Sequence, residues 1–328
     1  MNEIRKIGIL TSGGDAPGIN ACIRAMTRWA RNSGKTLTGI REGYDGILEK
    51  KFERLVPEFA DSHLAHGGTF LGSSRSANFY KKKFRTLALK NLKEAGIQGL
   101  IVIGGNGSLQ GAKTFFSETG FPVIGIPKTI DNDVDGTDYT LGFDTALNNA
   151  VEALDKISVS ATSHRRVFFV EVMGRDAGHI ALYAGIASGA EVILVPETKT
   201  NLKTLEKKIK ENIAGNRRPL LVLVAEGDDA GRANEIRLLM KKKIPAFNPG
   251  VSILGYIQRG GTPSCFDRIL AAGFGVKAMN LLAKGKGGQM VNYRNGKIGS
   301  IPFSDALNKP HALNPELVEL ARTLGHMV

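Results

Sequence analysis

The segment Pro127–Asp133, PKTIDND, carries side chains that suit the transfer of a phosphoryl group to an alcohol. Asp131 and Asp133 offer two carboxylates, two residues apart. Lys128 adds a positive charge and Thr129 a hydroxyl. Phosphoryl transfer needs a base for the hydroxyl proton, and cationic groups or Mg²⁺ on the transferring oxygens. The segment therefore predicts a catalytic loop, with an Asx-rich structural turn as the alternative.

Two glycine-rich segments could hold the phosphates of a donor. The first, Thr11–Gly18, has the sequence TSGGDAPG, and Pro17 suits the first turn of a following helix. The second, Gly104–Ser108, reads GGNGS and offers Asn106 as an oxygen ligand. Adjacent glycines let backbone N–H groups close on a phosphate at a helix N-terminus. A tight structural turn is the alternative for each segment.

Arginines gather near the expected ends of strands in the second half of the chain. They are Arg165 and Arg166, Arg175 in the segment Met173–Gly178, and Arg259 in a glycine-bounded segment. Arginine binds phosphate through two parallel hydrogen bonds, so the group favours an anionic ligand. A single arginine would more often form a surface ion pair.

Apolar runs alternate with helical patterns along the whole chain. This alternation predicts parallel sheets covered by helices on both faces, with the functional loops at the carboxyl ends of the strands. The fold class is thus α/β, with two doubly wound domains between which the chain crosses. We expect strands at 6–11, 99–103, 122–126, 166–172, 191–195 and 219–225, and helices at 17–32, 144–158, 176–188 and 202–214.

Composition narrows the classes of function. The chain has 328 residues and a formal net charge of +13. The lysine triplets 81–83 and 241–243 are short, and no basic tail accompanies them, so we read them as solvated faces rather than a nucleic-acid site. The longest apolar run, 220–225, is too short to span a bilayer. Two cysteines, Cys22 and Cys265, suit a reducing cytoplasm and cannot form a disulfide framework.

Seven motifs together resemble the 6-phosphofructokinase family. In chain order they are TSGGDAPG, GGTFLGS, GGNGS, PKTIDND, SHRR, VMGR and GYIQRGGTP…DRILA. The resemblance covers essentially the whole chain. It implies a homotetramer that uses ATP and Mg²⁺ to phosphorylate the C1 hydroxyl of fructose 6-phosphate. It also implies a donor-binding domain at 1–141 plus about 257–306, and a fructose 6-phosphate domain at 142–256 plus about 307–328.

The resemblance assigns roles to individual residues. Asp131 matches the catalytic base, helped by Thr129, Lys128 and Arg175, and Arg166 matches a residue that reaches the sugar phosphate of a neighbouring subunit. The donor-side residues are Gly14, Arg75, Ser76, Gly105, Asn106, Gly107 and Ser108. The sugar-side residues are Thr129, Asp131, Arg166, Met173, Gly174, Arg175, Glu226, Tyr256 and Arg259. Asn106 and Asp133 are the candidate ligands of the metal, and Arg24, Arg28, Glu191 and Arg217 match an effector site.

The chain departs from the family pattern at several of these positions. Asn106 replaces an Asp that usually helps to hold Mg²⁺. Lys128 replaces the Gly of the familiar bacterial ATP-dependent form and is typical of pyrophosphate users, whereas Gly107 lacks the Asp that those users carry. Tyr256 stands in place of a His, and Gly250 in place of an Arg.

Three functions remain open at this point. ATP is favoured as the donor because Gly107 leaves room for the α-phosphate. A pyrophosphate-dependent enzyme is the first alternative, and a sugar-phosphate sensor without turnover, suggested by Asn106, is the second. The effector match is partial, because Ser158 and Gly215 replace basic residues of the family, and Arg24 and Arg28 also form a plain i, i+4 helix pair.

Overall fold

The computed structural model describes residues 4–164, 166–215, 219–244 and 248–328. The chain divides into two compact units, each built from two separate stretches of sequence. Unit 1 comprises Met1–Thr145 and Arg259–His311, and unit 2 comprises Ala146–Gln258 and Ala312–Val328. The chain therefore enters each unit twice, and each unit has a sheet of its own.

The sheet of unit 1 has seven strands among the described residues, in the order β11-β10-β5-β4-β1-β2-β3. Neighbours from β10 to β2 are parallel, whereas β3 and β11 pair antiparallel at the two edges. The central strands are continuous apolar runs buried on both faces, as expected of parallel strands between helices. The strands are β1 (Lys6–Ser12), β2 (Thr36–Ile40), β3 (Phe52–Arg54), β4 (Gly99–Gly104), β5 (Val123–Pro127), β10 (Gln289–Arg294) and β11 (Lys297–Pro302).

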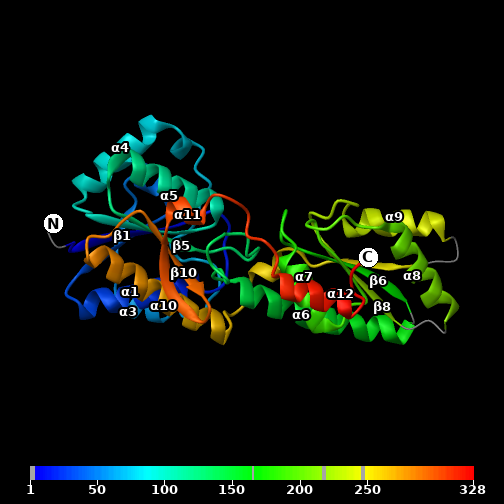
Figure 1. Ribbon diagram of the computed structural model, residues 1–328. Helices are drawn as coiled ribbons and strands as arrows, with labels where there is room; N and C mark the ends of the chain where they lie inside the picture. Colours follow the sequence, from blue (N-terminus) through cyan, green and yellow to red (C-terminus); the bar gives the residue numbers. More distant parts are fainter. Residues whose placement is uncertain (1–3, 165, 216–218, 245–247) are drawn as a thin grey trace. The chain divides into compact units, whose positions relative to one another are not determined.

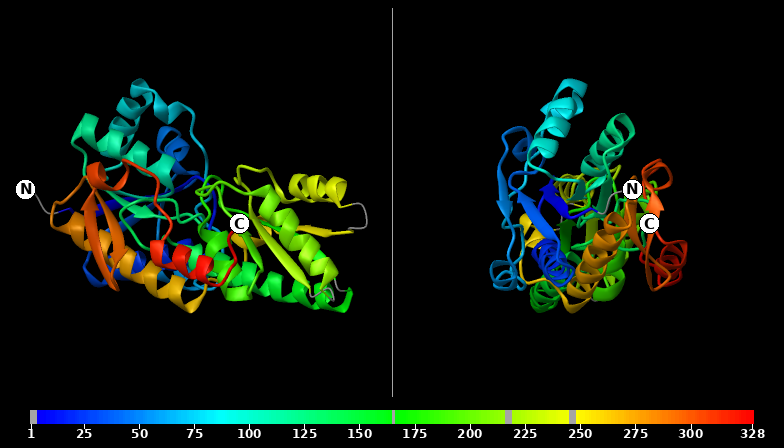
Figure 2. Two further views of the ribbon diagram at one scale, coloured as in Figure 1. Left: turned by 45° about the vertical axis from the view of Figure 1, so that its right-hand side comes forward. Right: turned by 90° about the vertical axis from the view of Figure 1, so that its left-hand side faces the viewer.

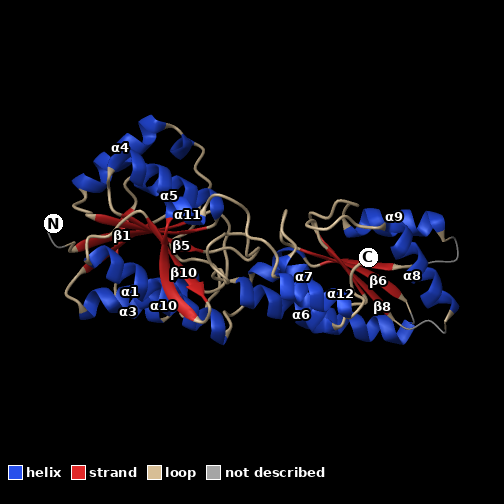
Figure 3. Cartoon of the chain, viewed as in Figure 1, coloured by secondary structure: helices blue, strands red, loops and turns tan. Residues whose placement is uncertain are grey.

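Helices cover both faces of this sheet (Figures 1 and 3). One face carries α1 (Ile19–Asn32), α3 (Pro57–Asp61) and α10 (Cys265–Ala283). The other carries α2 (Gly43–Leu48), the 3₁₀ turn η1 (Asn78–Tyr80), α4 (Lys82–Glu94), α5 (Asn106–Thr119) and α11 (Phe303–Ala306). On that second face, Tyr44, Phe79 and Phe115 join the strands in one buried apolar cluster.

The sheet of unit 2 has four parallel strands among the described residues, in the order β7-β8-β6-β9. They are β6 (Val167–Val172), β7 (Val192–Leu194), β8 (Leu220–Ala225) and β9 (Gly250–Ile253). Two helices, α8 (Leu202–Ala214) and α9 (Ala233–Lys243), share one buried cluster with β6, β7 and β8. The other face carries α7 (His179–Ser188) and α12 (Pro315–Thr323), with α6 (Phe143–His164) on the same side, as the views in Figure 2 also show.

The doubly wound α/β fold expected from the sequence is confirmed in both units. The expected strands and helices all occur. The bounds of α8 are as expected, and most other elements begin or end a few residues away from the expected positions. The helix α6 continues to His164 rather than ending at 158. Among the elements that were not expected are the strands β2, β3, β9, β10 and β11, several helices, and the 3₁₀ turn η2 (Gly255–Arg259). None of the helices in the described ranges is both long and apolar enough to cross a bilayer.

Candidate active site

Three loops of unit 1 meet at one edge of its sheet. Strands β5, β4 and β1 are neighbours and parallel, so their carboxyl ends lie side by side. The segments that follow them are Gly13–Gly18 after β1, which we call the donor loop, and Lys128–Asp133 after β5, which we call the catalytic loop. After β4 comes Gly105–Ser108, the N-cap and first residues of α5, which we call the GNGS loop. The sheet order therefore brings together the three segments that the sequence predicted to handle phosphates.

Hydrogen bonds tie these loops to one another. The Ser108 hydroxyl donates to the Ser12 hydroxyl at 2.9 Å, which joins the GNGS loop to the end of β1. The Lys128 N–H donates to the Gly104 carbonyl at 3.0 Å. The Lys128 ammonium group, almost fully buried, donates to the carbonyls of Ser12, at 3.2 Å, and of Gly14. Lys128 thus supports the donor loop directly.

The catalytic loop is shaped by Asn132, a residue that the sequence analysis did not single out. Asn132 has a left-handed backbone, with φ of 52°, which asparagine tolerates better than most residues. Its buried side chain accepts from the Thr140 N–H at 2.9 Å and donates to the Asp138 carbonyl at 3.0 Å. The Asp131 N–H donates to the Thr129 hydroxyl at 3.1 Å. These bonds fix the backbone on both sides of Asp131, whose side chain is 5% exposed.

Asp133 and Asn106 connect the catalytic loop to the GNGS loop. The Asn106 amide nitrogen donates to the Asp133 carboxylate oxygen Oδ2 at 2.9 Å and to the Asp133 carbonyl at 3.0 Å. The other carboxylate oxygen, Oδ1, is buried without a hydrogen-bond partner in the structure. An orphaned carboxylate oxygen is a position that a divalent cation can satisfy. No cluster of three or more His, Cys, Asp or Glu in the described ranges could hold a metal by itself.

The segment before α4 flanks the GNGS loop. The Ser76 hydroxyl is buried and accepts from the Phe79 N–H at 3.3 Å, whereas Arg75 is exposed. Tyr80 is 78% exposed, and its hydroxyl lies 3.9 Å from where a Cβ on Gly107 would stand. The space beside Gly107 is therefore open, apart from the tip of one tyrosine.

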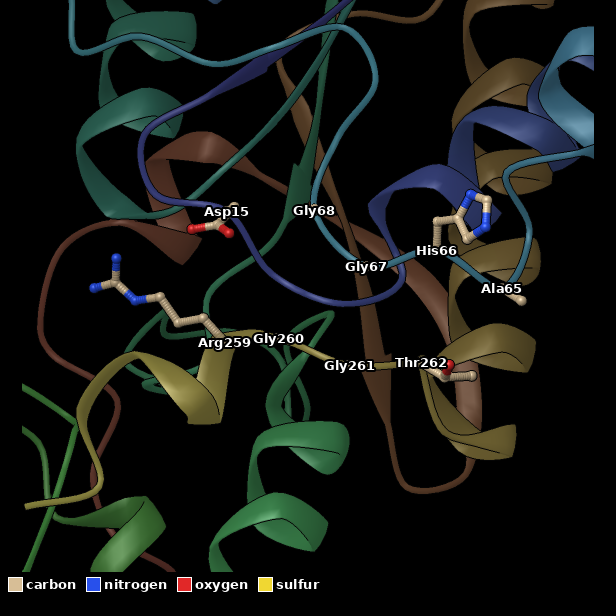
Figure 4. Close-up of a pocket in the computed structure, with 9 residues that line it drawn as sticks. All are labelled: Asp15, Ala65, His66, Gly67, Gly68, Arg259, Gly260, Gly261 and Thr262. Atoms are coloured by element: carbon tan, nitrogen blue, oxygen red, sulfur yellow. The ribbon is translucent and has the colours of Figure 1, made fainter.

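A pocket of about 480 Å³ lies beside the donor loop (Figure 4). It is lined by Asp15, Ala65, His66, Gly67, Gly68 and the segment 259–262. The Arg259 guanidinium lies 3.5 Å from the place of a Cβ on Gly14, and a Cβ on Gly67 would stand 2.5 Å from the Gly261 carbonyl oxygen. The glycines at 14 and 67 therefore allow close packing around the pocket. The family resemblance places Arg259 on the sugar side, and in the structure its guanidinium also lies beside Gly14 of the donor loop.

Unit 2 presents a second set of loops at the carboxyl edge of its own sheet. Strands β8, β6 and β9 are neighbours, and Glu226, the segment Met173–Arg175 and Tyr256 follow them. The Arg175 N–H donates to the Glu226 carboxylate at 3.1 Å, and the φ of 52° places Arg175 in the left-handed region. A Cβ on Gly227 would stand 2.1 Å from the Arg175 carbonyl oxygen, so the two loops are in direct contact. The arginine side chain is exposed.

Arg166 lies at the other end of β6 from this set. The strand begins at Val167 and ends at Val172, just before Met173. Six residues of a parallel strand extend roughly 20 Å, which an arginine side chain does not cover. Within one copy of unit 2, the structure therefore does not bring Arg166 together with Arg175, Glu226 and Tyr256. The neighbouring Arg165 lies outside the described residues.

Three of the four residues matched to an effector site are engaged with other groups in the structure. Arg24 and Arg28 on α1 both form ion pairs with Asp61 on α3. Glu191 belongs to unit 2, where its carboxylate accepts from the Leu221 N–H at 2.6 Å. Arg217 lies outside the described residues. Arg24 and Arg28 thus belong to unit 1 and Glu191 to unit 2, and a shared effector site stays a prediction.

Asp267 is a second residue that sequence reasoning missed. It is fully buried on α10 and accepts from the N–H of Gly142 and the N–H of Thr145, both at 2.8 Å, and from the Thr145 hydroxyl at 2.5 Å. Asp267 therefore secures the start of α6 directly after the segment that packs on the catalytic loop. Burial raises the pKa of the Asp267 carboxyl to about 6, against the lowering effect of these hydrogen bonds. The signal in the sequence was the DRILA motif that contains it.

Comparison with known proteins identifies the family. The phosphofructokinase family model matches residues 6–282. An ATP-dependent 6-phosphofructokinase of Persephonella marina is 48% identical over 303 residues, 92% of this chain and 93% of the relative. The enzyme of the same name from Lysinibacillus sphaericus is 44% identical over 98% of this chain and 100% of the relative.

Solved structures agree with this result. Pichia pastoris phosphofructokinase in the T-state aligns with a TM-score of 0.86 and 31% identity, over 99% of this chain and 37% of that longer chain. A pyrophosphate-dependent phosphofructokinase of Marinobacter aquaeolei, at 22% identity, shares the fold with a TM-score of 0.87 over 99% of this chain and 88% of that one. On the family model and these identities, the chain belongs to the phosphofructokinase family.

Proposed function

We propose that this protein is an ATP-dependent 6-phosphofructokinase of glycolysis, which transfers the γ-phosphoryl group of ATP to the C1 hydroxyl of fructose 6-phosphate. The observation that carries the proposal is the meeting of the donor loop, the GNGS loop and the catalytic loop at one edge of the sheet of unit 1. That junction sets glycine-rich backbone beside a buried, fixed carboxylate. The names of the relatives at 42–48% identity support ATP as the donor.

Asp131 acts as the general base. As the C1 hydroxyl oxygen attacks the γ-phosphorus, Asp131 takes up its proton, the bond from the γ-phosphorus to the bridging oxygen breaks, and ADP leaves. Thr129 fixes the backbone of Asp131 through the hydrogen bond at 3.1 Å. Lys128 holds the donor loop in place and supplies positive charge beside it.

Unit 1 binds the donor and unit 2 binds the sugar phosphate. On the donor side we assign the backbone of Gly14 and Gly105–Ser108, with Arg75 and Ser76, because these glycine-rich backbones suit phosphate oxygens. On the sugar side we assign Met173, Gly174, Arg175, Glu226 and Tyr256 of unit 2, and the family resemblance assigns Thr129 and Arg259 of unit 1 as well. Arg175 also stabilises negative charge on the transferring group, because its exposed guanidinium can bind phosphate oxygens in bidentate fashion.

The residues present suit Mg²⁺ brought in with the nucleotide. Mg²⁺ is commonly held through one or two carboxylates together with substrate phosphates, and when bound it neutralises charge on the transferring oxygens. The orphaned Oδ1 of Asp133 is the carboxylate oxygen available for it. Asn106 is the second candidate ligand, through its amide oxygen.

A coupled assay with purified protein tests this function. Fructose 6-phosphate is supplied with either ATP or pyrophosphate, and fructose 1,6-bisphosphate is measured with aldolase and reducing enzymes. We expect turnover with ATP and little with pyrophosphate. Turnover with pyrophosphate alone would favour the alternative donor, which Lys128 suggests. The absence of turnover with both donors, in a protein that binds fructose 6-phosphate, would favour a sensor.

We also propose that the active form is a homotetramer in the cytoplasm. Arg166 is separated from the other sugar-side arginine by the length of β6. It can therefore act on the sugar phosphate held by a neighbouring copy rather than on the one held by its own. The two cysteines, one buried and one exposed, are free thiols, which suits a reducing compartment. Size-exclusion chromatography with light scattering measures the oligomeric state directly.

A further inference from the structure

The contact between Asn106 and Asp133 fixes the orientation of the Asn106 amide. The Asn106 NH₂ group carries two hydrogens, and both are used, one on the Asp133 carboxylate and one on the Asp133 carbonyl. Because both partners are acceptors, the nitrogen of the amide must face Asp133. The orientation of Asn106 is therefore fixed by the network.

A carboxylate at position 106 could not make this contact. Aspartate has no hydrogens to donate, so its oxygen would meet two oxygens of Asp133 at a distance near that of a hydrogen bond. Like charges so close repel each other unless a cation lies between them. The N–H groups of the Asn106 amide thus bring partial positive charge to the Asp133 oxygens. With a carboxylate at position 106, a bridging cation would have to bring it.

We propose that Asn106 is a metal-independent latch that joins the GNGS loop to the catalytic loop and positions Asp133 before any divalent cation arrives. The strand ends from which the two loops leave are joined by the backbone bond from the Lys128 N–H to the Gly104 carbonyl, but Asn106 provides the connection at the carboxylate itself. In this arrangement the free protein offers a cation one carboxylate rather than two. Free Mg²⁺ then binds the protein weakly, and the cation enters together with the donor phosphates.

The proposal rests on the proposed function only in assigning the GNGS loop and the catalytic loop to phosphoryl transfer. Its test uses no substrate. Thermal unfolding is followed for the unmodified protein and for Asn106→Asp, each in chelator and in Mg²⁺, and binding of Mn²⁺ alone is measured by electron paramagnetic resonance. A lack of phosphoryl transfer would therefore not affect these readouts.

We expect the Tm of the unmodified protein to be the same in chelator and in Mg²⁺. Asn106→Asp should lower the Tm in chelator by roughly 3–10 °C, through lost hydrogen bonds to a charged group and new repulsion. Mg²⁺ alone should then recover much of that loss, and Mn²⁺ should bind Asn106→Asp at least about tenfold more tightly, as expected for a second carboxylate.

Two control variants separate a latch from a merely structural contact. The exchange Asn106→Asp with Asp133→Asn restores the contact between one amide and one carboxylate, but leaves an oxygen at position 106 facing the backbone carbonyl of residue 133. It should therefore recover part of the Tm in chelator, without any effect of Mg²⁺. Asn106→Ala removes the hydrogen bonds without adding charge, and should lower the Tm equally in chelator and in Mg²⁺. The proposal is overturned if Mg²⁺ alone stabilises the unmodified protein as much as Asn106→Asp, or if Asn106→Asp has an unchanged Tm in chelator.

Discussion

Asp131 combines the properties that a general base in this loop requires. Its side chain is buried, and its backbone N–H is bonded to the Thr129 hydroxyl. The next residue, Asn132, adopts a left-handed conformation that two side-chain hydrogen bonds maintain. A backbone held on both sides and a buried side chain limit the positions that the carboxylate can take, which matters because a base must lie within hydrogen-bond reach of its proton.

Replacement of this carboxylate should affect turnover rather than binding. Positioned bases contribute about 10²–10⁴-fold to a rate. We expect Asp131→Asn to lower kcat by that order and to leave the affinity for fructose 6-phosphate, measured by calorimetry, nearly unchanged. A kcat close to that of the unmodified protein would exclude Asp131 as the base.

A substitution at Gly107 tests whether ATP is the phosphoryl donor. The nearest atom to a Cβ at this position is the Tyr80 hydroxyl, at 3.9 Å, so the protein itself tolerates a side chain there. Gly107→Asp should lower kcat/KM with ATP by roughly 10²-fold, because a like charge against the α-phosphate costs several kcal/mol.

Gly107→Ala is the matched control for this prediction. It adds the same Cβ without the charge, and we expect its kcat/KM with ATP to stay within a few-fold of the original. Equal losses in both variants would mean that bulk or helix geometry, rather than charge, decides. A Gly107→Asp variant that keeps full activity with ATP would show that this position does not contact the donor.

At the scale of elements, periodicity predicts the parallel core but not its edges. The central strands are apolar along their whole length because helices cover both faces, and such runs can be read from sequence. The antiparallel hairpin of β10 and β11 was missed, although it turns through Asn295 and Gly296, both with positive φ. Asn-Gly is a strong signal for a two-residue hairpin turn, but these strands are short and partly polar, and the pattern was not distinctive.

The same limit applies to the site. The three phosphate-handling loops were identified from sequence, because their residue types are unusual and each follows an apolar run. The roles of Asn132 and Asp267 could not be predicted, since they depend on which backbone groups the fold brings near. Asp267 bonds residues more than a hundred positions away in the chain. Residue type indicates the chemistry, whereas only the fold shows which side chains support it.

Asp267 gives the start of α6 a dependence on pH. Its folded pKa of about 6 lies above the unfolded value of 3.8. Below the unfolded value the protonated carboxyl favours the folded state, and this contribution is lost as the pH rises through 6. Between these values the free energy of unfolding should therefore fall with rising pH, by up to roughly 3 kcal/mol from this group.

Asp267→Asn removes the pH-dependent contribution of this carboxyl to the free energy of unfolding. Comparison of the variant with the unmodified protein then measures that contribution. Carboxylates beside arginines, such as Asp61, have lowered pKa values and act in the opposite direction, so the informative quantity is the difference between the two proteins. We expect the variant to be less stable throughout, because its NH₂ group faces donors at Thr145. The deficit should be larger at pH 4 than at pH 7. A deficit that does not change across this range in urea titrations would contradict the raised pKa.

At the scale of the whole molecule, the separation of the arginines along β6 bears on assembly. Arg175 follows the carboxyl end of the strand and Arg166 precedes its amino end, so one copy presents them at opposite edges of one sheet. The proposal that Arg166 binds the sugar phosphate therefore goes with the proposal that it does so in a second copy of the chain.

Complementation between two impaired variants tests whether Arg166 acts on the sugar phosphate of a neighbouring copy. Arg166→Ala should raise KM for fructose 6-phosphate with a smaller effect on kcat, because a substrate-binding arginine contributes mainly to affinity. Oligomers that mix Arg166→Ala with Asp131→Asn subunits contain sites in which an intact Asp131 from one copy meets an intact Arg166 from the other. Such oligomers should recover part of the activity at low substrate concentration.

As the control, a mixture of Asp131→Asn with Arg175→Ala should recover none, since the proposal takes both of these residues from the same copy. If verified mixed oligomers of the first pair stay as inactive as the Asp131→Asn protein at low substrate concentration, Arg166 acts only within its own chain or not at all.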